Sequence, residues 1–285
     1  ARERGMKAPR PSQRLQAAAT AHDAALYDAQ VVPRYSVLFG RMLLPEIPTD
    51  ARMTVLDLGC GTGYPALDVM RRLPEGSRVI AIDPDPLLLD VARTRALDEV
   101  GRKIFFKAES AEQLSFGDAV FDLAIGNLAL SAFVQPERAL LEVRCVLKKD
   151  GRLLLTLPME GTFEEVLDMF RELALKRDQP ELAQRAERIA ARYPSPRRLE
   201  GALEAAGFSG VEVRTAELGV PFGSAMELAT DPFVRLVALP EWRWIAGFEP
   251  GGEQLLGHAL RALDTYFGHG PLTLRVHAGL ARASA

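Results

Sequence analysis

Short apolar runs alternate with amphipathic stretches along the chain from about Met53 onward. Each apolar run is strand-sized and mostly uninterrupted, which is typical of parallel strands buried on both faces. The stretches between them carry apolar residues at helical spacing, and Pro65 and Pro86 stand where a first helical turn tolerates proline. The pattern predicts strands at residues 54–58, 78–82, 104–106, 121–125, 153–157, 211–214 and 272–280.

The alternation of strands and helices predicts the overall architecture. Strands joined by helices of this length form parallel βαβ units with right-handed crossovers. We therefore expect an α/β fold with a Rossmann-like, doubly wound sheet. In such a sheet, ligands bind beyond the carboxyl ends of the strands, so the residues just after each strand are the candidate site.

Other segments are expected around this core. Residues 1–14 hold five basic residues and two prolines and are interpreted as a flexible tail. Residues 15–50 are predicted to form an N-terminal helical lid that is broken into two pieces at Pro33. Residues 51–285 form the core, with helical insertions at about 160–192 and 218–267 that we expect to cap a substrate pocket.

The composition adds expectations about partners and location. The 285 residues are 48% hydrophobic and 26% charged, with a formal net charge of −3, so nothing favours binding to nucleic-acid phosphates. We expect no membrane span and no signal peptide, because the apolar runs are only strand-sized. The two cysteines and four histidines show no metal-ligand spacing, which predicts a cytoplasmic protein without a metal site.

A glycine-rich turn follows the first predicted strand. In VLDLGCGTG, residues 55–63, glycines stand at 59, 61 and 63, where the absence of a Cβ lets the backbone approach a ligand closely. Asp83 ends the next strand, twenty residues beyond Gly63, where a carboxylate can accept hydrogen bonds from both hydroxyls of a ribose. Both features are shared with dinucleotide-binding domains, so two classes of ligand have to be compared.

The register of the glycines and the neighbouring acid favour one of these classes. The dinucleotide pattern Gly-x-Gly-x-x-Gly fails when it starts at Gly59, because Tyr64 fills its third position. Started at Gly61 it fits formally, with alanine in the third position, but it then places Pro65 inside the phosphate-binding turn. Asp57 would also lie near a pyrophosphate, which it would repel, whereas it would attract a ligand with a cationic ammonium group.

At these residues the chain resembles the class I S-adenosylmethionine-dependent methyltransferases. The matching motifs are Asp57–Gly63, Asp83, Asp122–Ile125 with Asn127 after it, and Lys149–Leu153. The resemblance implies S-adenosylmethionine as the cofactor. It also implies a mostly parallel seven-stranded sheet with an antiparallel last strand and helical lid insertions.

Within this family the chain is similar to the small-molecule type, which includes ubiquinone-biosynthesis and malonyl-carrier-protein methyltransferases. The segments that carry this similarity are Asn127–Leu130 and Ser110–Phe116. The resemblance covers roughly residues 20–160 well and the last two strand units more loosely.

The resemblance also implies which residues contact the cofactor. Asp57 would lie near its amino group, Asp83 would hold the ribose hydroxyls, and Asn127 would lie under the reactive sulfonium. A lid tyrosine over the sulfonium would add a cation–π contact of about 0.5–2 kcal/mol, although both lid tyrosines could equally be packing residues. The full set is Tyr27, Tyr35, Asp57, Gly59, Cys60, Gly61, Gly63, Asp83, Pro84, Ser110, Ala111, Asn127 and Leu128. The catalytic residue stays unknown, with Tyr27, Tyr35 and Asn127 as candidates.

Two departures from the family pattern bear on these roles. Ser110 stands where the family commonly has an aspartate for the adenine amino group, so Ser110, Glu109 or Glu112 could make that contact. Ser131 and Ala132 stand where some relatives have a histidine near the substrate, which removes the obvious general base.

The resemblance implies methyl transfer to a small-molecule or carrier-bound acceptor by in-line displacement. Positioning of donor and acceptor can supply about 7–11 kcal/mol of barrier reduction in such a reaction. Two alternatives stay open: a cofactor-binding module without turnover, and a methyltransferase acting on protein or RNA. The acceptor atom and the oligomeric state are not indicated by the sequence.

Overall fold

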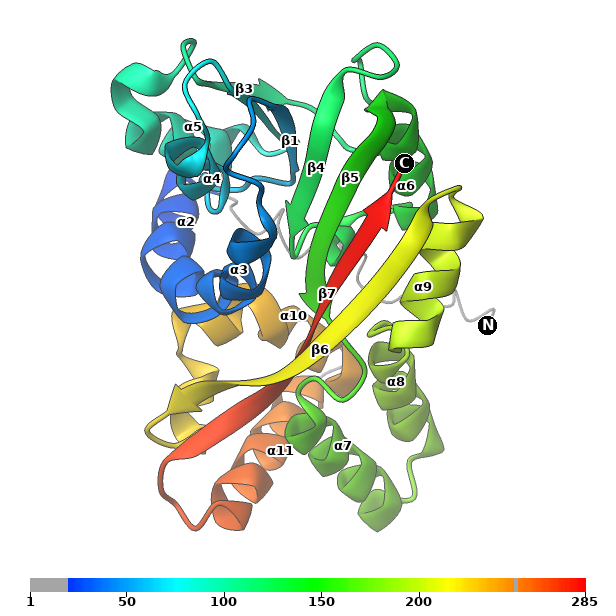
Figure 1. Ribbon diagram of the computed structural model, residues 1–285. Coiled ribbons are helices and arrows are strands. Elements are labelled where there is room, and N and C mark those ends of the chain that lie inside the picture. The colour runs from blue at the N-terminus through cyan, green and yellow to red at the C-terminus, as the bar shows by residue number, and fades with distance from the viewer. Residues whose placement is uncertain (1–19, 249–250) are drawn as a thin grey trace, which may run out of the picture.

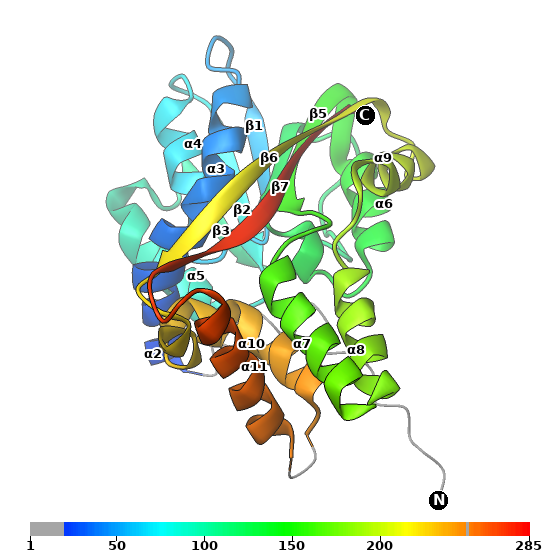
Figure 2. The same cartoon turned by 90° about the horizontal axis from the view of Figure 1, so that it is seen from below.

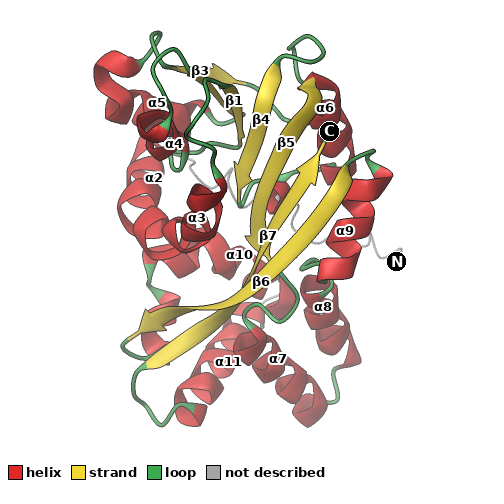
Figure 3. Cartoon of the chain, viewed as in Figure 1, coloured by secondary structure: helices red, strands yellow, loops and turns green. Residues whose placement is uncertain are grey.

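The computed structural model describes residues 20–248 and 251–285 and contains one seven-stranded sheet (Figures 1 and 3). The strand order is β3-β2-β1-β4-β5-β7-β6. The five strands β1 to β5 pair in parallel, and β7 runs antiparallel to its neighbours β5 and β6. The predicted Rossmann-like sheet with an antiparallel last strand is therefore confirmed. The strands are β1 Thr54–Leu58, β2 Arg78–Asp83, β3 Ile104–Ala108, β4 Phe121–Asn127, β5 Leu147–Pro158, β6 Ser209–Phe222 and β7 Leu272–Ser284.

The last three strands are longer than the sequence pattern predicts. Strand β5 begins at Leu147, six residues before the predicted strand at 153–157, and its pairing with β4 shifts register between Phe121 and Leu123. Strand β6 continues to Phe222, so the helical insertion expected from residue 218 begins only after that strand. The reason is that β6 and β7 go on pairing with each other beyond the end of β5, which satisfies their backbone groups without a third strand.

Helices cover both faces of the sheet. One apolar cluster packs the N-terminal helices α3, α4 and α5 against the sheet, and a second packs α6 and α9 against it. The helices outside the helical unit described below are α2 Ala21–Leu26, η1 Tyr27–Ser36, α3 Val37–Leu43, η2 Leu44–Glu46, α4 Ala66–Arg72, α5 Pro86–Ala96, η3 Leu97–Glu99, η4 Leu130–Ala132, α6 Pro136–Val146 and α9 Pro196–Ala205. The proline at the first position of α5 and α6 fits the absence of an N–H partner there.

A helical unit lies beyond the carboxyl end of β5 and under the projecting β6–β7 ribbon (Figures 1 and 2). It consists of α7 Glu164–Arg177, α8 Pro180–Ala190, η5 Ala225–Ala229, η6 Val234–Ala238, α10 Leu239–Ala246 and α11 Gly252–Tyr266. Its apolar core includes Trp242 and Trp244, both almost fully buried, and it also takes in Val31, Tyr35 and Phe39 of the N-terminal helices. The N-terminal helices therefore contact both the sheet and the helical unit.

The N-terminal helix passes through Pro33 without the predicted break. Residues Tyr27–Ser36 form a π-helix with Pro33 inside it, and α3 follows directly. Proline has no N–H to donate, and the wider π turn lets the chain continue as a helix past it. The expected tail, residues 1–14, lies outside the described residues. In the part of the chain that the structure describes, no helix is long and apolar enough to cross a membrane.

Candidate functional site

The glycine-rich turn lies between β1 and α4, at the carboxyl edge of the sheet. Gly59 and Gly61 have φ values of +61° and +55°, a conformation that a side chain would strain. A Cβ on Gly59 would lie 3.1 Å from the Cβ of Ala129, so the turn also packs closely against the segment after β4. The turn is held to the next strand by the backbone N–H of Cys60, which donates to the carbonyl of Ile82 at 2.9 Å.

Asp83, at the end of β2, points its carboxylate toward this turn. One oxygen accepts from the backbone N–H of Gly61 at 2.9 Å and the other from that of Asp85 at 2.9 Å. The side chain is almost fully buried, and burial raises the pKa of Asp83 to about 6, against the pull of these two N–H donors. The carboxylate is thus held in one orientation with acceptor capacity to spare.

Asp57, on β1, is a fully buried acid. No hydrogen bond of ordinary geometry reaches either of its oxygens from a described residue, although the backbone N–H of Ala66 lies close enough to oppose the rise in its pKa. Burial and the nearby charge of Asp83 raise the pKa of Asp57 well above its ordinary value. A buried carboxyl group left in this state fits a site that is completed by a cationic ligand.

Two cavities open at this edge of the sheet and share Gly59 and Ala132 in their walls. The first, which we call the Asp83 cavity, has a volume of about 290 Å³. It is lined by Gly59, Asp83, Pro84, Asp85, Pro86, Glu109, Ser110, Ala111, Ala132 and Phe133. The second, the tyrosine cavity, has a volume of about 60 Å³. It is lined by Tyr27, Tyr35, Gly59, Gly61, Asn127, Leu128, Ala129, Ser131, Ala132, Pro158, Leu236 and Val237.

Asn127, the last residue of β4, joins three parts of the molecule. Its Nδ2 donates to the backbone carbonyl of Ser36 at 3.1 Å, and its Oδ1 accepts from the hydroxyl of Thr156 at 2.7 Å. Its amide therefore fixes the N-terminal helix to β4 and β5, beside the tyrosine cavity. The next residue, Leu128, has φ of +67°, which is strained for a leucine and typical of a functional site.

The two tyrosines of the π-helix η1 lie in different surroundings. Tyr35 is buried in an aromatic cluster, with ring centroids 5.1 Å from Phe39 and 5.0 Å from Phe233. Tyr27 is half-buried above the glycine turn, and its ring lies 4.0 Å from the position that a Cβ on Gly61 would take. Burial, together with Asp83 and Asp28, raises the pKa of Tyr27, so its hydroxyl stays protonated at neutral pH.

The structure brings most of the expected site residues to the two cavities, and three of them line neither cavity. Cys60 packs into the core with its thiol 3.9 Å from the carbonyl of Gly61. Gly63 faces away from both cavities, because a Cβ there would lie 3.3 Å from Ala92 on α5. Asp57 lies below the turn and lines neither cavity.

Ser110 and Glu109 line the Asp83 cavity, as two of the three expected alternatives for an adenine contact. The hydroxyl of Ser110 accepts from the backbone N–H of Glu112 at 3.2 Å. The carboxylate of Glu112 accepts from the backbone of Val134 and Gln135 and does not line the cavity. Glu112 is thus used to hold the loop before α6.

Several residues at the site could not be found from the sequence. Leu236 and Val237 of η6 complete the tyrosine cavity from the other end of the chain. Asp28 of η1 accepts from the hydroxyl of Thr62 at 2.7 Å and pairs with Arg95 at 2.5 Å, which ties the N-terminal helix to the glycine turn. Thr62 lies inside the glycine motif, which marks it as part of the turn, but no local sequence pattern indicates its contact with Asp28.

This chain resembles known methyltransferases in sequence. Residues 56–155 match the family model described as a methyltransferase domain. The chain is 33% identical over 195 residues to a malonyl-[acyl-carrier protein] O-methyltransferase of Herminiimonas arsenicoxydans, which covers 66% of this chain and 64% of that protein. It is 26% identical over 159 residues to a ubiquinone/menaquinone biosynthesis C-methyltransferase of Citrifermentans bemidjiense, covering 51% of this chain and 67% of that protein. This chain thus spans about two thirds of the length of each relative.

A solved structure shows the same fold. The YcgJ protein of Bacillus subtilis superposes with a TM-score of 0.56 at 20% identity, over 86% of this chain and 96% of that one. The similarity covers most of the chain.

Proposed function

The chain belongs to the class I S-adenosylmethionine-dependent methyltransferases, and on this premise we propose that it transfers a methyl group from S-adenosylmethionine to a small-molecule or carrier-bound acceptor. The observation that carries the proposal is the pair of cavities that meet at Gly59, one beside the Asp83 carboxylate and one between the tyrosines and η6. A donor that spans both cavities would place its reacting group where they join. The cytoplasmic location expected from the cysteine usage stays a prediction.

The residues present fit the cofactor. The Asp83 cavity offers a fixed carboxylate for the ribose hydroxyls and the walls of Pro84, Ser110 and Ala111 for the adenine. Asp57, with neither oxygen in a hydrogen bond of ordinary geometry, supplies a negative charge for the amino group of the methionine part. Gly59 and Gly61 let the backbone approach the ligand where any Cβ would intervene.

When bound, S-adenosylmethionine supplies a methyl group already activated on a sulfonium. The part left to the protein is to hold and align the reactants and to exclude water. Asn127 holds the N-terminal helix beside the tyrosine cavity, and Tyr27 lies close to the glycine turn. Tyr27 is the better placed of the two lid tyrosines for a cofactor contact, since the aromatic cluster around Tyr35 supports a packing role.

The walls of the tyrosine cavity favour an acceptor that ionises easily. The described residues lining it include no carboxylate, imidazole, amine or thiol side chain, and the hydroxyl of Ser131 already donates to the carbonyl of Leu128 at 2.9 Å. Tyr27, whose pKa is raised, cannot serve as a base near neutral pH. A carboxylate, thiol or enol with an apolar body loses its proton easily enough to react without a strong base from the protein. The named relatives act on a malonyl-carrier protein and in quinone biosynthesis.

Two measurements test this function. Calorimetry with S-adenosylmethionine and with NAD identifies the cofactor, and a screen with methyl-labelled S-adenosylmethionine identifies the acceptor among malonyl-carrier protein, quinone precursors, protein and RNA. We expect binding of S-adenosylmethionine alone and label transfer to one of the small or carrier-bound acceptors. Binding of NAD in its place would overturn the proposal, and label transfer only to protein or RNA would replace the acceptor class. Binding without transfer to any acceptor would favour a cofactor-binding module.

A further inference from the structure

The tyrosine cavity has two opposing walls that come from distant parts of the chain. One wall is the π-helix η1, which contributes Tyr27 and Tyr35, and the other is the π-helix η6, which contributes Leu236 and Val237. π-Helical turns are rare and frequently occur at functional sites. The distance between these two walls sets the width of the space in which an acceptor would lie.

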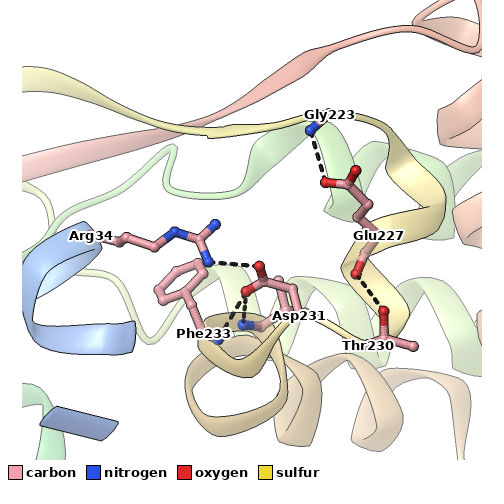
Figure 4. Close-up of polar contacts among 7 residues, drawn as sticks. Arg34, Gly223, Glu227, Thr230, Asp231 and Phe233 are labelled. Atoms are coloured by element: carbon pink, nitrogen blue, oxygen red, sulfur yellow. Dashed lines mark hydrogen bonds and ion pairs between the residues drawn. The ribbon is translucent and has the colours of Figure 1, made fainter. Parts of the chain in front are cut away.

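An ion pair joins the two walls. Arg34, next to Tyr35, donates to Oδ2 of Asp231 at 2.6 Å (Figure 4). The other oxygen of Asp231 accepts from the backbone N–H of Phe233 at 2.9 Å and of Val234 at 3.2 Å, which fixes the start of η6. The guanidinium also lies 5.1 Å from the ring centroid of Phe222 and 5.9 Å from that of Phe233, which adds cation–π contacts with both rings.

The other end of η1 is fixed to the glycine turn. Asp28 accepts from the hydroxyl of Thr62 and pairs with Arg95, which in turn donates to the carbonyl of Thr62 at 3.2 Å. A continuous path of polar contacts therefore runs from the glycine turn through η1 and Arg34 to Asp231 and η6.

We propose that Arg34 is a positioning residue, which sets the gap between η1 and η6 through its ion pair with Asp231. Through the same contacts, cofactor binding at the glycine turn changes the position of η6, the far wall of the tyrosine cavity. The inference rests on the proposed function in one respect, namely that the glycine turn binds S-adenosylmethionine. A tightly aligned pair between half-buried side chains transmits a displacement better than apolar contacts, because its geometry is directional. Acceptor selection is thereby linked to the presence of the donor.

A second pair, between η6 and the helix α2 that precedes η1, supplies a matched control. Arg235 pairs with Asp23 at 3.1 Å, but the Arg235 side chain is 46% exposed, against 29% for Arg34. Neither pair lines the tyrosine cavity, but only Arg34 lies on η1, beside the cavity residue Tyr35. An ion pair that only adds stability would give the same result at both places, and a positioning pair would not.

Amide hydrogen exchange, with S-adenosylhomocysteine as the probe, tests the inference in the full chain. In the wild-type protein, saturating probe is expected to slow exchange in residues 27–36 and also in residues 231–238, the latter by about tenfold. In Arg34→Met the protection of 27–36 should persist while that of 231–238 is lost, with the probe affinity changed by less than about threefold. Arg34→Lys should restore part of the lost protection, and Arg235→Met should behave as the wild type.

The outcomes separate this inference from the proposed function. Failure of the wild-type protein to bind the probe would overturn the proposed function and the inference together. Probe binding with undiminished protection of 231–238 in Arg34→Met would overturn the inference alone. Asp231→Asn is a second variant in case Arg34→Met folds poorly. It keeps an oxygen for the N–H groups of Phe233 and Val234 but loses the charge, so it should also lose the protection of 231–238. Wild-type protection of 231–238 in Asp231→Asn would overturn the inference as well.

Discussion

The Asp83 cavity and the tyrosine cavity share Gly59, yet they are built in different ways. The Asp83 cavity is made by the ends of β1, β2, β3 and β4 and by the residues that directly follow them. The tyrosine cavity depends on η1 and η6, whose linking residues Arg34 and Asp231 are 197 positions apart. The Asp83 cavity is thus local and tied to the sheet, whereas the tyrosine cavity can change with the helical unit while the Asp83 cavity stays the same.

Trp242→Ala tests how far the helical unit supports the whole chain. Trp242 is 1% exposed and packs edge-to-face on Phe163 at 6.2 Å, so its removal should lower the free energy of unfolding by about 3–5 kcal/mol. Urea unfolding measures the change. Leu175→Ala on α7, where the side chain is 83% exposed, is the control and should stay within about 0.5 kcal/mol of the wild type. A loss below about 1 kcal/mol for Trp242→Ala would show that this core contributes little to stability.

Asp83→Asn tests the cofactor side alone. The amide cannot accept hydrogen bonds on both of its polar atoms, so the affinity for S-adenosylmethionine should fall by about 1–3 kcal/mol, roughly 5- to 150-fold. Calorimetry measures the affinity. Asp90→Asn on α5, an exposed acid paired with Arg93, should leave it unchanged. Equal affinity in Asp83→Asn and the wild type would mean that the ribose binds elsewhere.

The pH dependence of cofactor binding distinguishes Asp83 from Asp57, the two buried acids near the glycine turn. Burial raises the pKa of Asp83 to about 6, so its protonated form prevails at lower pH and accepts fewer hydrogen bonds. Cofactor affinity should therefore fall by about tenfold per pH unit below this value and level off above it. The cofactor-free protein should lose stability as pH rises from 3.8 to about 6, because the folded pKa is the higher one.

In Asp83→Asn the inflection of the affinity near pH 6 should disappear. Asp57, whose pKa burial and Asp83 also raise, is expected to contribute to the dependence that remains, together with the α-amino group of the cofactor. Calorimetry across pH 5 to 8 measures the cofactor affinity. Repeating one pH in a second buffer excludes an effect of the buffer. An unchanged inflection in Asp83→Asn would assign it to another group.

Thr62→Val tests the contact between the glycine turn and the N-terminal helix, where the expected effect is smallest. Loss of the hydrogen bond to Asp28 should weaken S-adenosylmethionine binding by about 0.5–1.5 kcal/mol, because the helix over the turn is held less firmly. Thr94→Val, which removes a hydrogen bond to the Asp90 carbonyl on the exposed surface of α5, is the matched control. Identical effects of the two variants would argue against a role of the N-terminal helix in cofactor binding.

The sequence predicted the sheet well and marked residues that line the Asp83 cavity, because both depend on short-range patterns. Apolar runs of strand length predicted the strands, and the glycine motif and Asp83 supply Gly59 and Asp83 to the Asp83 cavity and Gly59 and Gly61 to the tyrosine cavity. Predictions were less accurate where tertiary contacts outweigh local preference. Pro33 does not end the N-terminal helix, and β6 runs to Phe222 because β7 pairs with it.

What the sequence by itself determined is therefore the doubly wound core, the glycine turn and the acid that follows the second strand. Each of these needs only neighbouring residues of the right size, charge and backbone freedom. Only the tertiary structure decided which residues close the tyrosine cavity. The packing of a helical unit against the sheet edge pairs Arg34 with Asp231 and brings Tyr27 and Leu236 to the same cavity. Contacts between such distant segments leave no periodic mark in the chain, because their spacing along the sequence is set by the intervening fold.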